Sequence, residues 1–211
     1  MPDRDPYLYK GTSVLKNKLN IKVQEHLDRA EGDYTSLRLA ELAENPLDGD
    51  YDFAHLCAIH GYIFQDLFDW AGKPRMIDIQ RPEPVLGGWS VEYSPHVEIT
   101  SNTRSVLATM NATNWADFLL RDVAEKFSSC FAELWKIHPF REGNTRTVTH
   151  FCCQFLDSVG IEINRRLFEE NAAYLRTTLV AYDAVFKEGD FSQKEHLREI
   201  IYDAMNIESQ K

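Results

Sequence analysis

The sequence has little positive charge, and this shortage limits the partners that it can bind. Its 211 residues include 23 Lys and Arg against 33 Asp and Glu, which gives a formal net charge of −10. Nucleic acids and anionic membrane surfaces are bound through a basic footprint. We therefore expect no direct nucleic-acid binding and no membrane partner, whereas a small nucleotide remains possible because it needs only a few local donors.

Long apolar runs and paired cysteines are also missing. No stretch approaches the roughly 20 apolar residues of a membrane-spanning helix, and no apolar segment follows the first six residues as it would in a secretory signal. The four cysteines, at 57, 130, 152 and 153, form no CxxC pair. Cys152 and Cys153 are neighbours, poorly placed to bridge each other or to share a metal. We interpret all four as buried thiols and expect a cytoplasmic protein.

What the sequence does contain is enough apolar material for one compact domain over residues 1–211. Hydrophobic residues make up 44% and aromatic residues 12%, so a packed core is expected rather than disorder. No internal repeat or low-complexity tract occurs. Residues 1–12 are expected to form an irregular N-terminal arm.

Apolar side chains recur at helical spacing through most of the chain. The pattern predicts helices over about 22–44, 52–70, 96–110, 115–137, 144–159, 168–187 and 192–206. Asn114 is expected to cap the fourth of these. Between the second and third helices, residues 76–80 and 89–93 alternate like strands around prolines and glycines, which predicts a β-hairpin over 76–93. The expected fold is all-α, a helical bundle with one small β-hairpin.

The segment between the two central helices carries the chemistry. Gly143 and Asn144 open the second of these helices, where unpaired backbone N–H groups can bind phosphate. Gly143 also allows close backbone approach. Arg141 and Arg146 can add charge-assisted hydrogen bonds to phosphate oxygens.

Two further residues of this segment supply a metal ligand and a base. Glu142 offers hard oxygen atoms of the kind that Mg2+ prefers. His138 has an ordinary pKa near neutrality and can accept a proton from an attacking hydroxyl. The segment therefore holds the parts that phosphoryl or nucleotidyl transfer requires. A helix–loop–helix corner with solvated charges is the simpler alternative, but the composition argues against it.

This run resembles the Fic family signature, H-x-F-x-(D/E)-G-N-G-R-x-x-R. The matching residues are His138, Phe140, Glu142, Gly143, Asn144 and Arg146. Residues 56–75 are similar to the segment that precedes the flap of Fic proteins, and residues 5–9 resemble the start of small bacterial Fic toxins. The similarity covers most of the chain.

The resemblance implies a Fic-type helical fold and transfer of AMP from ATP to a Ser, Thr or Tyr hydroxyl of a target protein. His138 would be the base and Glu142 would hold Mg2+. Phe140 would anchor the loop in the core. The nucleotide would be bound by Arg141, Gly143, Asn144, Thr145 and Arg146. The hairpin would be a flap that pairs with an extended target segment, with Ile77, Ile79, Val91 and Tyr93 as docking residues.

The resemblance also implies partners and a mode of restraint. The target could be a DNA topoisomerase such as gyrase. Many family members are held inactive by a helix carrying (S/T)-x-x-x-E-(G/N), whose Glu blocks the γ-phosphate site. Ser129 and Ser158 are each followed four residues later by Glu, but neither Glu precedes Gly or Asn. The chain therefore looks like a toxin whose inhibitor is a separate small antitoxin protein.

Two positions depart from the signature. Thr145 replaces the second Gly, and Thr149 replaces the final Arg, which in the family contacts the γ-phosphate. Arg165 or Arg166 is a candidate substitute for the missing Arg. The loss of this Arg leaves open a binding module that has lost catalysis.

Other readings also remain open. Within the same chemistry, the transferred group could be UMP or another nucleotide or phosphoryl group. A metal hydrolase on His55, His60 and His138 is a more distant alternative. We interpret His60 as a core histidine whose nitrogens find partners inside the protein.

Overall fold

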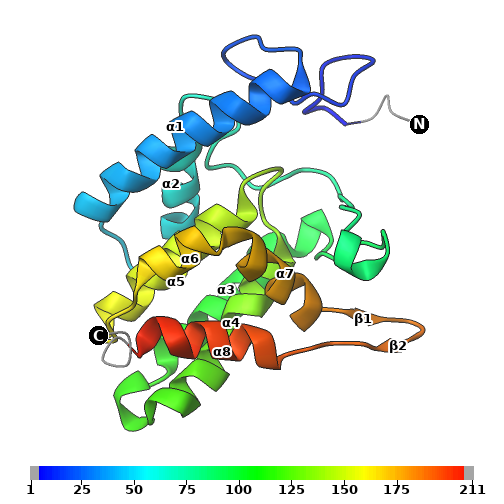
Figure 1. Ribbon diagram of the computed structural model, residues 1–211. Helices are drawn as coiled ribbons and strands as arrows, with labels where there is room; N and C mark the ends of the chain where they lie inside the picture. The colour runs from blue at the N-terminus through cyan, green and yellow to red at the C-terminus, as the bar shows by residue number, and fades with distance from the viewer. Residues whose placement is uncertain (1–4, 207–211) are drawn as a thin grey trace.

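Eight α-helices dominate the computed structural model, which describes residues 5–206. They are α1 (Gln24–Glu44), α2 (Phe53–Phe64), α3 (Ile99–Ala112), α4 (Leu120–Ile137), α5 (Asn144–Ser158), α6 (Arg165–Glu170), α7 (Ala172–Tyr182) and α8 (Glu195–Met205). Figure 1 shows α1 along one side of the molecule and α8 along the other. Within the described residues, no helix has both the length and the apolar character needed to cross a membrane. The all-α prediction is confirmed.

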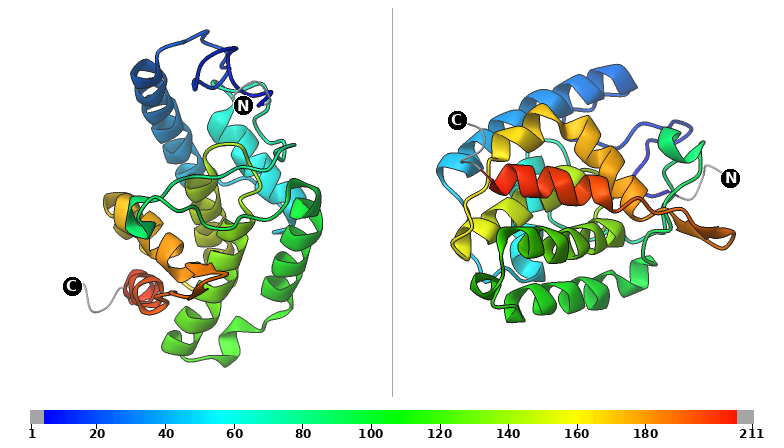
Figure 2. Two further views of the ribbon diagram at one scale, coloured as in Figure 1. Left: turned by 90° about the vertical axis from the view of Figure 1, so that its right-hand side faces the viewer. Right: turned by 60° about the horizontal axis from the view of Figure 1, so that its bottom comes forward.

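Helix α4 lies at the centre of the bundle and contacts α3, α5, α7 and α8, as the two views of Figure 2 show. Phe127, Phe131 and Trp135 follow one another at four-residue spacing on its buried face, which is the spacing of one helix face. Phe127 stacks on Phe155 of α5 with ring centroids 6.2 Å apart. This packing holds the middle of α4 against the far end of α5, while Trp135 Nε1–H donates to the Thr145 hydroxyl at 2.9 Å and joins the end of α4 to the start of α5.

Helix α1 reaches the same region from the other side. It packs on α2, and α2 in turn packs on α5. Helix α2 therefore lies between α1 and α5, the helix that follows the α4–α5 loop. Leu27 and Leu42 are the most deeply buried apolar residues of α1. The expected helix over 22–44 is confirmed within two residues.

The expected β-hairpin over 76–93 is not formed. The chain folds back here around a short 3₁₀ helix, η2 (Pro84–Leu86), and only the tip is closed, where Glu83 N–H donates to Trp89 O and Gly88 N–H donates to Glu83 O. Below the tip, Arg81 N–H donates to the hydroxyl of Ser90 and no strand ladder follows. Pro82 lacks an N–H and so interrupts the ladder. We call residues 77–94 the flap loop.

A two-stranded hairpin does occur, but farther along the chain. The expected helix over 168–187 is wrong in two respects. Asn171 separates α6 from α7, and α7 ends at Tyr182. Strands β1 (Val185–Phe186) and β2 (Gly189–Asp190) then pair antiparallel and project from the bundle beside the flap loop (Figures 1 and 2).

Three smaller expectations also have outcomes. The helix expected from 115 begins at Leu120, because a separate 3₁₀ turn, η4 (Trp115–Asp117), precedes it and Asn114 makes no side-chain cap. The helix expected over 52–70 ends at Phe64, and the one expected from 96 begins with the 3₁₀ turn η3 (His96–Glu98). In the N-terminal arm, residues 1–4 lie outside the described residues, and Leu8 forms an isolated bridge with Leu15.

Candidate active site

The α4–α5 loop begins at His138, where the backbone turns sharply. Helix α4 ends at Ile137, and His138 adopts a left-handed conformation with φ 52° while its N–H donates to Trp135 O. A residue with a side chain rarely adopts this conformation, and it costs free energy that the surrounding structure must offset. The turn brings the imidazole under the flap loop.

Asn144 and Phe140 close the loop on itself. The Asn144 amide accepts from Phe140 N–H and donates to Phe140 O, both at 2.8 Å. Asn144 is buried, so its side chain shapes the loop rather than facing solvent. Phe140 is fully buried and stacks on His60 at a centroid distance of 3.8 Å, as the anchoring role predicts.

His60 is a buried core histidine, as predicted. Gly72 N–H donates to its Nδ1 at 2.8 Å, so Nε2 carries the proton and donates to Glu142 O at 3.1 Å. Burial lowers the pKa of His60 to about 3. It therefore supports the loop from behind, which argues against a metal site on His55, His60 and His138. Among residues 5–206, no three His, Cys, Asp or Glu side chains are grouped as metal ligands.

Gly143 permits the close approach that opens α5. Its φ is +76°, and a Cβ at this position would lie 2.0 Å from Cζ of Phe64. No larger residue fits without moving Phe64. The first intrahelical bond of α5 is Thr147 N–H to Gly143 O, so the N–H groups of residues 144–146 have no partner within the helix and can hold an anion.

The His138 imidazole is held in its neutral form. It is 1% exposed and stacks on Tyr93 of the flap loop at a centroid distance of 3.9 Å. Burial lowers its pKa well below the usual value, and the positive charges of Arg81, Arg176 and Arg75 act in the same direction. Its Nδ1 is buried with no hydrogen-bond partner among residues 5–206. A neutral imidazole can accept a proton.

Arg75 connects the flap loop to the α4–α5 loop. Its guanidinium is fully buried and donates to the carbonyls of His138 (2.8 Å), Ile77 (2.6 Å) and Ser94. It thereby ties both ends of the flap loop to the end of α4. Removal of this side chain would take the donor away from all three carbonyls, of which that of His138 is buried.

Glu142 is ionised and already has partners for both oxygens. Oε1 accepts from Gly143 N–H at 2.9 Å, and Oε2 pairs with Arg81 of the flap loop. Burial opposes the charged form of Glu142, but Arg81, the Gly143 N–H and Arg146 together hold its pKa below the usual range. An ionised carboxylate beside an anion-binding helix end fits Mg2+, which takes few protein ligands and completes its shell with phosphates and water.

Arg146 points to α1, where Glu31 pairs with it and Thr35 accepts a hydrogen bond from it at 2.8 Å. Burial raises the pKa of Glu31, although Arg146 counteracts the shift. The arginine that was expected to bind phosphates is therefore paired with a carboxylate. Glu31 is followed by Gly32, which matches the last two positions of the inhibitory motif, with Leu27 in place of its Ser or Thr.

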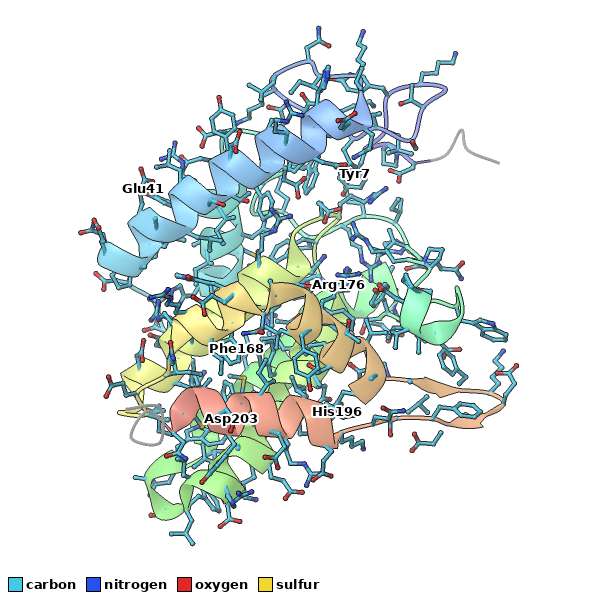
Figure 3. The ribbon with its side chains drawn as sticks, viewed as in Figure 1. Tyr7, Glu41, Phe168, Arg176, His196 and Asp203 are labelled. Atoms are coloured by element: carbon cyan, nitrogen blue, oxygen red, sulfur yellow. The ribbon has the colours of Figure 1, made fainter. Side chains whose placement is uncertain are left out.

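The other predicted nucleotide ligands also have partners. Arg141 points to the N-terminal arm and pairs with Asp5 at 2.7 Å. Thr145 accepts hydrogen bonds from Trp135 at 2.9 Å and from Arg176 at 3.2 Å. Arg176, on the face of α7 next to η2, also pairs with Glu83 of the flap loop (Figure 3).

Neither candidate substitute for the missing Arg of position 149 reaches this cluster. Arg165 pairs with Asp157, and Arg166 pairs with Glu170. The hydroxyl of Thr149 is buried without a partner among residues 5–206.

The four predicted docking residues take different positions in the flap loop. Ile77 and Ile79 are half-buried, and Tyr93 covers His138. Val91 is 1% exposed and belongs to the core, so it does not present its side chain to a partner in this conformation. The loop keeps the predicted location beside His138 but not the predicted strands.

Sequence reasoning missed Glu31, Arg81 and Arg176. For Glu31 a signal existed, because Glu31-Gly32 matches the end of the inhibitory pattern, but that pattern begins with Ser or Thr and the chain has Leu27 there. Arg81 follows the expected strand over 76–80 and directly precedes Pro82, inside the expected hairpin, where no motif marked it. Arg176 lies in a helix without a motif, and only the three-dimensional packing brings it to Thr145.

Comparison with known proteins connects this geometry to a family. A model of the Fic/DOC family matches residues 50–156. The probable protein adenylyltransferase y4lH of Sinorhizobium fredii is 36% identical over 166 residues, which cover 78% of this chain and 82% of that protein. The protein adenylyltransferase VbhT of Bartonella schoenbuchensis is 30% identical over 162 residues, but the match spans only 32% of its length.

Solved structures share the fold. The BepC protein of Bartonella tribocorum, with bound AMPPNP, superposes with a TM-score of 0.78 at 23% identity over 94% of this chain and 95% of that one. The type IV secretion effector BepA gives the same TM-score at 27% identity over 97% of this chain and 69% of that one. Together, the helical bundle, the α4–α5 loop and these relatives show that the chain belongs to the Fic/DOC family.

Proposed function

We propose that this protein is an adenylyltransferase that moves AMP from ATP to a Ser, Thr or Tyr hydroxyl of a target protein. The observation that carries the proposal is a neutral, buried His138 next to the unpaired N–H groups that open α5. A base and an anion site on the same loop are what nucleotidyl transfer needs. Relatives named as protein adenylyltransferases support the same reaction.

In this reaction, His138 takes the proton of the target hydroxyl while its oxygen bonds to the α-phosphorus. The bond between the α-phosphorus and the oxygen that bridges to the β-phosphate breaks, and pyrophosphate leaves. The N–H groups of residues 144–146 stabilise the charge on the α-phosphate. Glu142 would hold Mg2+, which neutralises phosphate charge when it is bound.

The pairs Arg81–Glu142 and Arg146–Glu31 imply an exchange of partners when ATP binds. Glu142 would release Arg81 in order to hold Mg2+, and Arg146 would release Glu31 in order to bind the outer phosphates. Both freed arginines then face phosphate oxygens, with which they form charge-assisted bonds.

Restraint has two candidate sources. The family resemblance favours a separate small antitoxin that inserts a glutamate near Arg146, and a toxin role in the cytoplasm. The Glu31–Arg146 pair favours a restraint within the chain, because Glu31 competes with phosphate for the same guanidinium. Deleting the charge of Glu31 discriminates between them.

The target docks on the flap loop. Residues 78–80 have no backbone hydrogen bond within the described part of the chain, so they can pair with an extended segment. A topoisomerase such as gyrase is one candidate target. Tyr93 must move aside before a hydroxyl can reach His138, because the two rings are stacked.

The test is incubation of the purified protein with a bacterial lysate and ATP labelled at the α-phosphate, beside the His138→Ala variant. A positioned base is worth about 10²–10⁴ in rate, so the variant should label proteins at least a hundredfold more slowly. Parallel reactions with α-labelled UTP, GTP and CTP identify the nucleotide. Equal labelling by both proteins would refute the role of His138, and binding of a lysate protein without any labelling would favour a binding module.

A further inference from the structure

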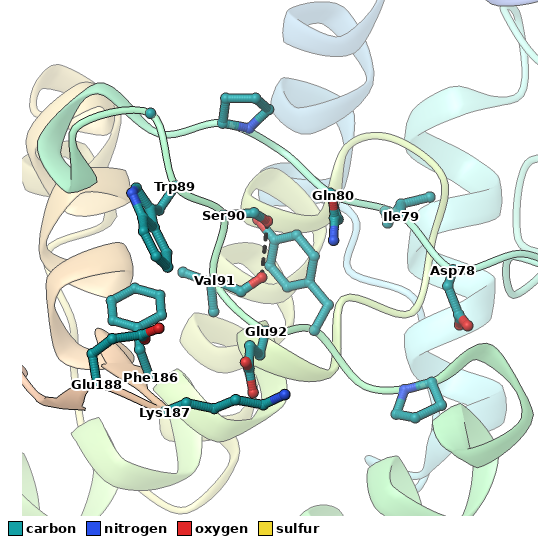
Figure 4. Close-up of a pocket in the computed structure, with 14 residues that line it drawn as sticks. Asp78, Ile79, Gln80, Trp89, Ser90, Val91, Glu92, Phe186, Lys187 and Glu188 are labelled. Atoms are coloured by element: carbon teal, nitrogen blue, oxygen red, sulfur yellow. Dashed lines mark hydrogen bonds between the residues drawn. The ribbon is translucent and has the colours of Figure 1, made fainter. Parts of the chain in front are cut away.

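A groove lies between the flap loop and the β1–β2 hairpin, on the side of the flap loop that carries Tyr93. Its volume is about 1040 Å³, and it is lined by two segments of the flap loop and by residues 186–188 of the hairpin. Figure 4 shows Phe186, Lys187 and Glu188 facing Trp89, Val91 and Glu92. The hairpin that follows α7 thus forms one side of the groove, and none of the motifs described above assigns a role to it.

The hairpin is attached to the flap loop at one end of the groove. Trp89 and Phe186 meet edge to face with ring centroids 5.8 Å apart. Edge-to-face packing is a favoured arrangement of two aromatic rings, so this contact holds the hairpin against the flap loop. Tyr93 also lines the groove and stacks on His138. The base itself is buried beneath Tyr93, so the groove lies next to the base and is separated from it by this one ring.

The charge of the groove is negative. Three carboxylates line it, at Asp78, Glu92 and Glu188, against the single cation of Lys187. Asp78 already has partners, because its Oδ1 lies 3.0 Å from Nδ1 of His96 and 3.6 Å from Nη1 of Arg75. Glu92, Lys187 and Glu188 are exposed, and none has an ion-pair partner within residues 5–206. Two glutamates are thus available to a ligand without breaking an existing pair.

We infer that the β1–β2 hairpin is the second wall of the target site, and that the groove takes an extended protein segment with Lys or Arg beside the hydroxyl that is modified. The inference rests on the proposed function, because it places the target of that reaction. The flap loop supplies main-chain pairing at residues 78–80. Glu92 and Glu188 supply the preference for cations, since opposite charges across an interface fix partner choice and register.

The inference predicts a charge-dependent affinity. An exposed ion pair contributes a few tenths to about 1 kcal/mol, which corresponds to about 1.5- to 5-fold in affinity. Removing both glutamate charges should weaken binding of a cationic segment about 2- to 25-fold at low salt. The difference should shrink as ionic strength rises, because exposed charges are screened.

The test is fluorescence anisotropy with two dye-labelled peptides, each with a central Tyr, flanked in one by Lys and in the other by Glu. The protein is the full chain without nucleotide. Glu92→Gln with Glu188→Gln should lower affinity for the Lys peptide, and Lys187→Gln should raise it. The matched control is Glu44→Gln with Glu162→Gln, which removes the same charge from exposed sites that do not line the groove and should change little.

Equal affinities for the two peptides, or the same loss in the control double variant, would overturn the inference. Binding is measured without ATP, so the result is separate from the transfer reaction. If the Glu92→Gln and Glu188→Gln changes lower affinity for the Lys peptide as expected, but the protein transfers AMP to no protein, only the proposed function would be contradicted. Transfer to lysate proteins that is indifferent to the groove variants would contradict only the inference.

Discussion

Replacement of Glu31 by Gln should increase the affinity for ATP. Glu31 lies on α1, and its carboxylate pairs with the guanidinium of Arg146. Gln keeps the size and hydrogen-bonding capacity of the side chain but removes its charge. Arg146 would then be available to the outer phosphates without first losing a carboxylate partner.

The size of the effect follows from the exposure of the pair. The side chain of Glu31 is 13% exposed and that of Arg146 is 34% exposed, so the pair is partly screened. Hydrogen bonds to charged groups contribute about 1.5–3 kcal/mol and exposed ion pairs about 1 kcal/mol or less. A value of about 1–2 kcal/mol corresponds to about 5- to 30-fold tighter ATP binding.

Isothermal titration calorimetry with ATP and with AMP provides the assay. AMP lacks the outer phosphates, so its affinity should change far less than that of ATP. Glu25→Gln is the matched control, since Glu25 lies on the same helix but is exposed and 3.9 Å from Arg29. Unchanged ATP affinity in Glu31→Gln, or an equal gain for AMP, would refute the competition between Glu31 and phosphate.

Three further predictions concern the metal, the core histidine and the helix start. Glu142→Ala should abolish the Mg2+ dependence of ATP binding, measured by titration with and without the metal; a retained dependence would assign the metal elsewhere. His60 should stay neutral down to about pH 3, so it should lower the free energy of unfolding as pH falls below about 6.5, by up to about 1.4 kcal/mol per pH unit; an imidazole that titrates near pH 6.5 by NMR would contradict this. Gly143→Ala should cost about 2–4 kcal/mol in a denaturant titration, because its Cβ would overlap Phe64. Gly87→Ala, with a similar φ of +62° and open space around it, should cost only about 1 kcal/mol.

The helices could be predicted from the sequence where one apolar face is long and regular. Helix α4 buries Phe127, Phe131 and Trp135 at four-residue spacing, and the prediction located its end within one residue. The prediction failed between 168 and 187, because Phe168, Leu175 and Leu179 maintain helical spacing across a break at Asn171. Periodicity cannot reveal such a break when both helices bury the same kind of side chain.

The flap loop shows a different limit. Alternation of apolar and polar residues predicted strands, but a strand also needs a partner with which to form hydrogen bonds. Here the backbone is held instead by Arg75, whose guanidinium occupies the carbonyls of Ile77 and Ser94. A buried arginine that replaces strand pairing cannot be identified from local sequence.

The candidate site shows what a motif can supply. The motif predicted which residues gather at the α4–α5 loop, because they are contiguous in the chain. It did not predict their partners, since Glu31, Arg81 and Arg176 come from α1, the flap loop and α7. These long-range contacts determine which arginines are free, and they arise only from the packing of distant helices.

If His138 directs an AMP unit, rather than a phosphoryl group, onto a protein hydroxyl, the transferred phosphorus is the α-phosphorus of ATP. The most direct measurement compares protein labelling from ATP that carries the label at the α-phosphate with labelling from ATP that carries it at the γ-phosphate. Wild-type protein should transfer the α-label and not the γ-label, and His138→Ala should transfer neither. Transfer of the γ-label, or undiminished α-labelling by His138→Ala, would contradict this expectation.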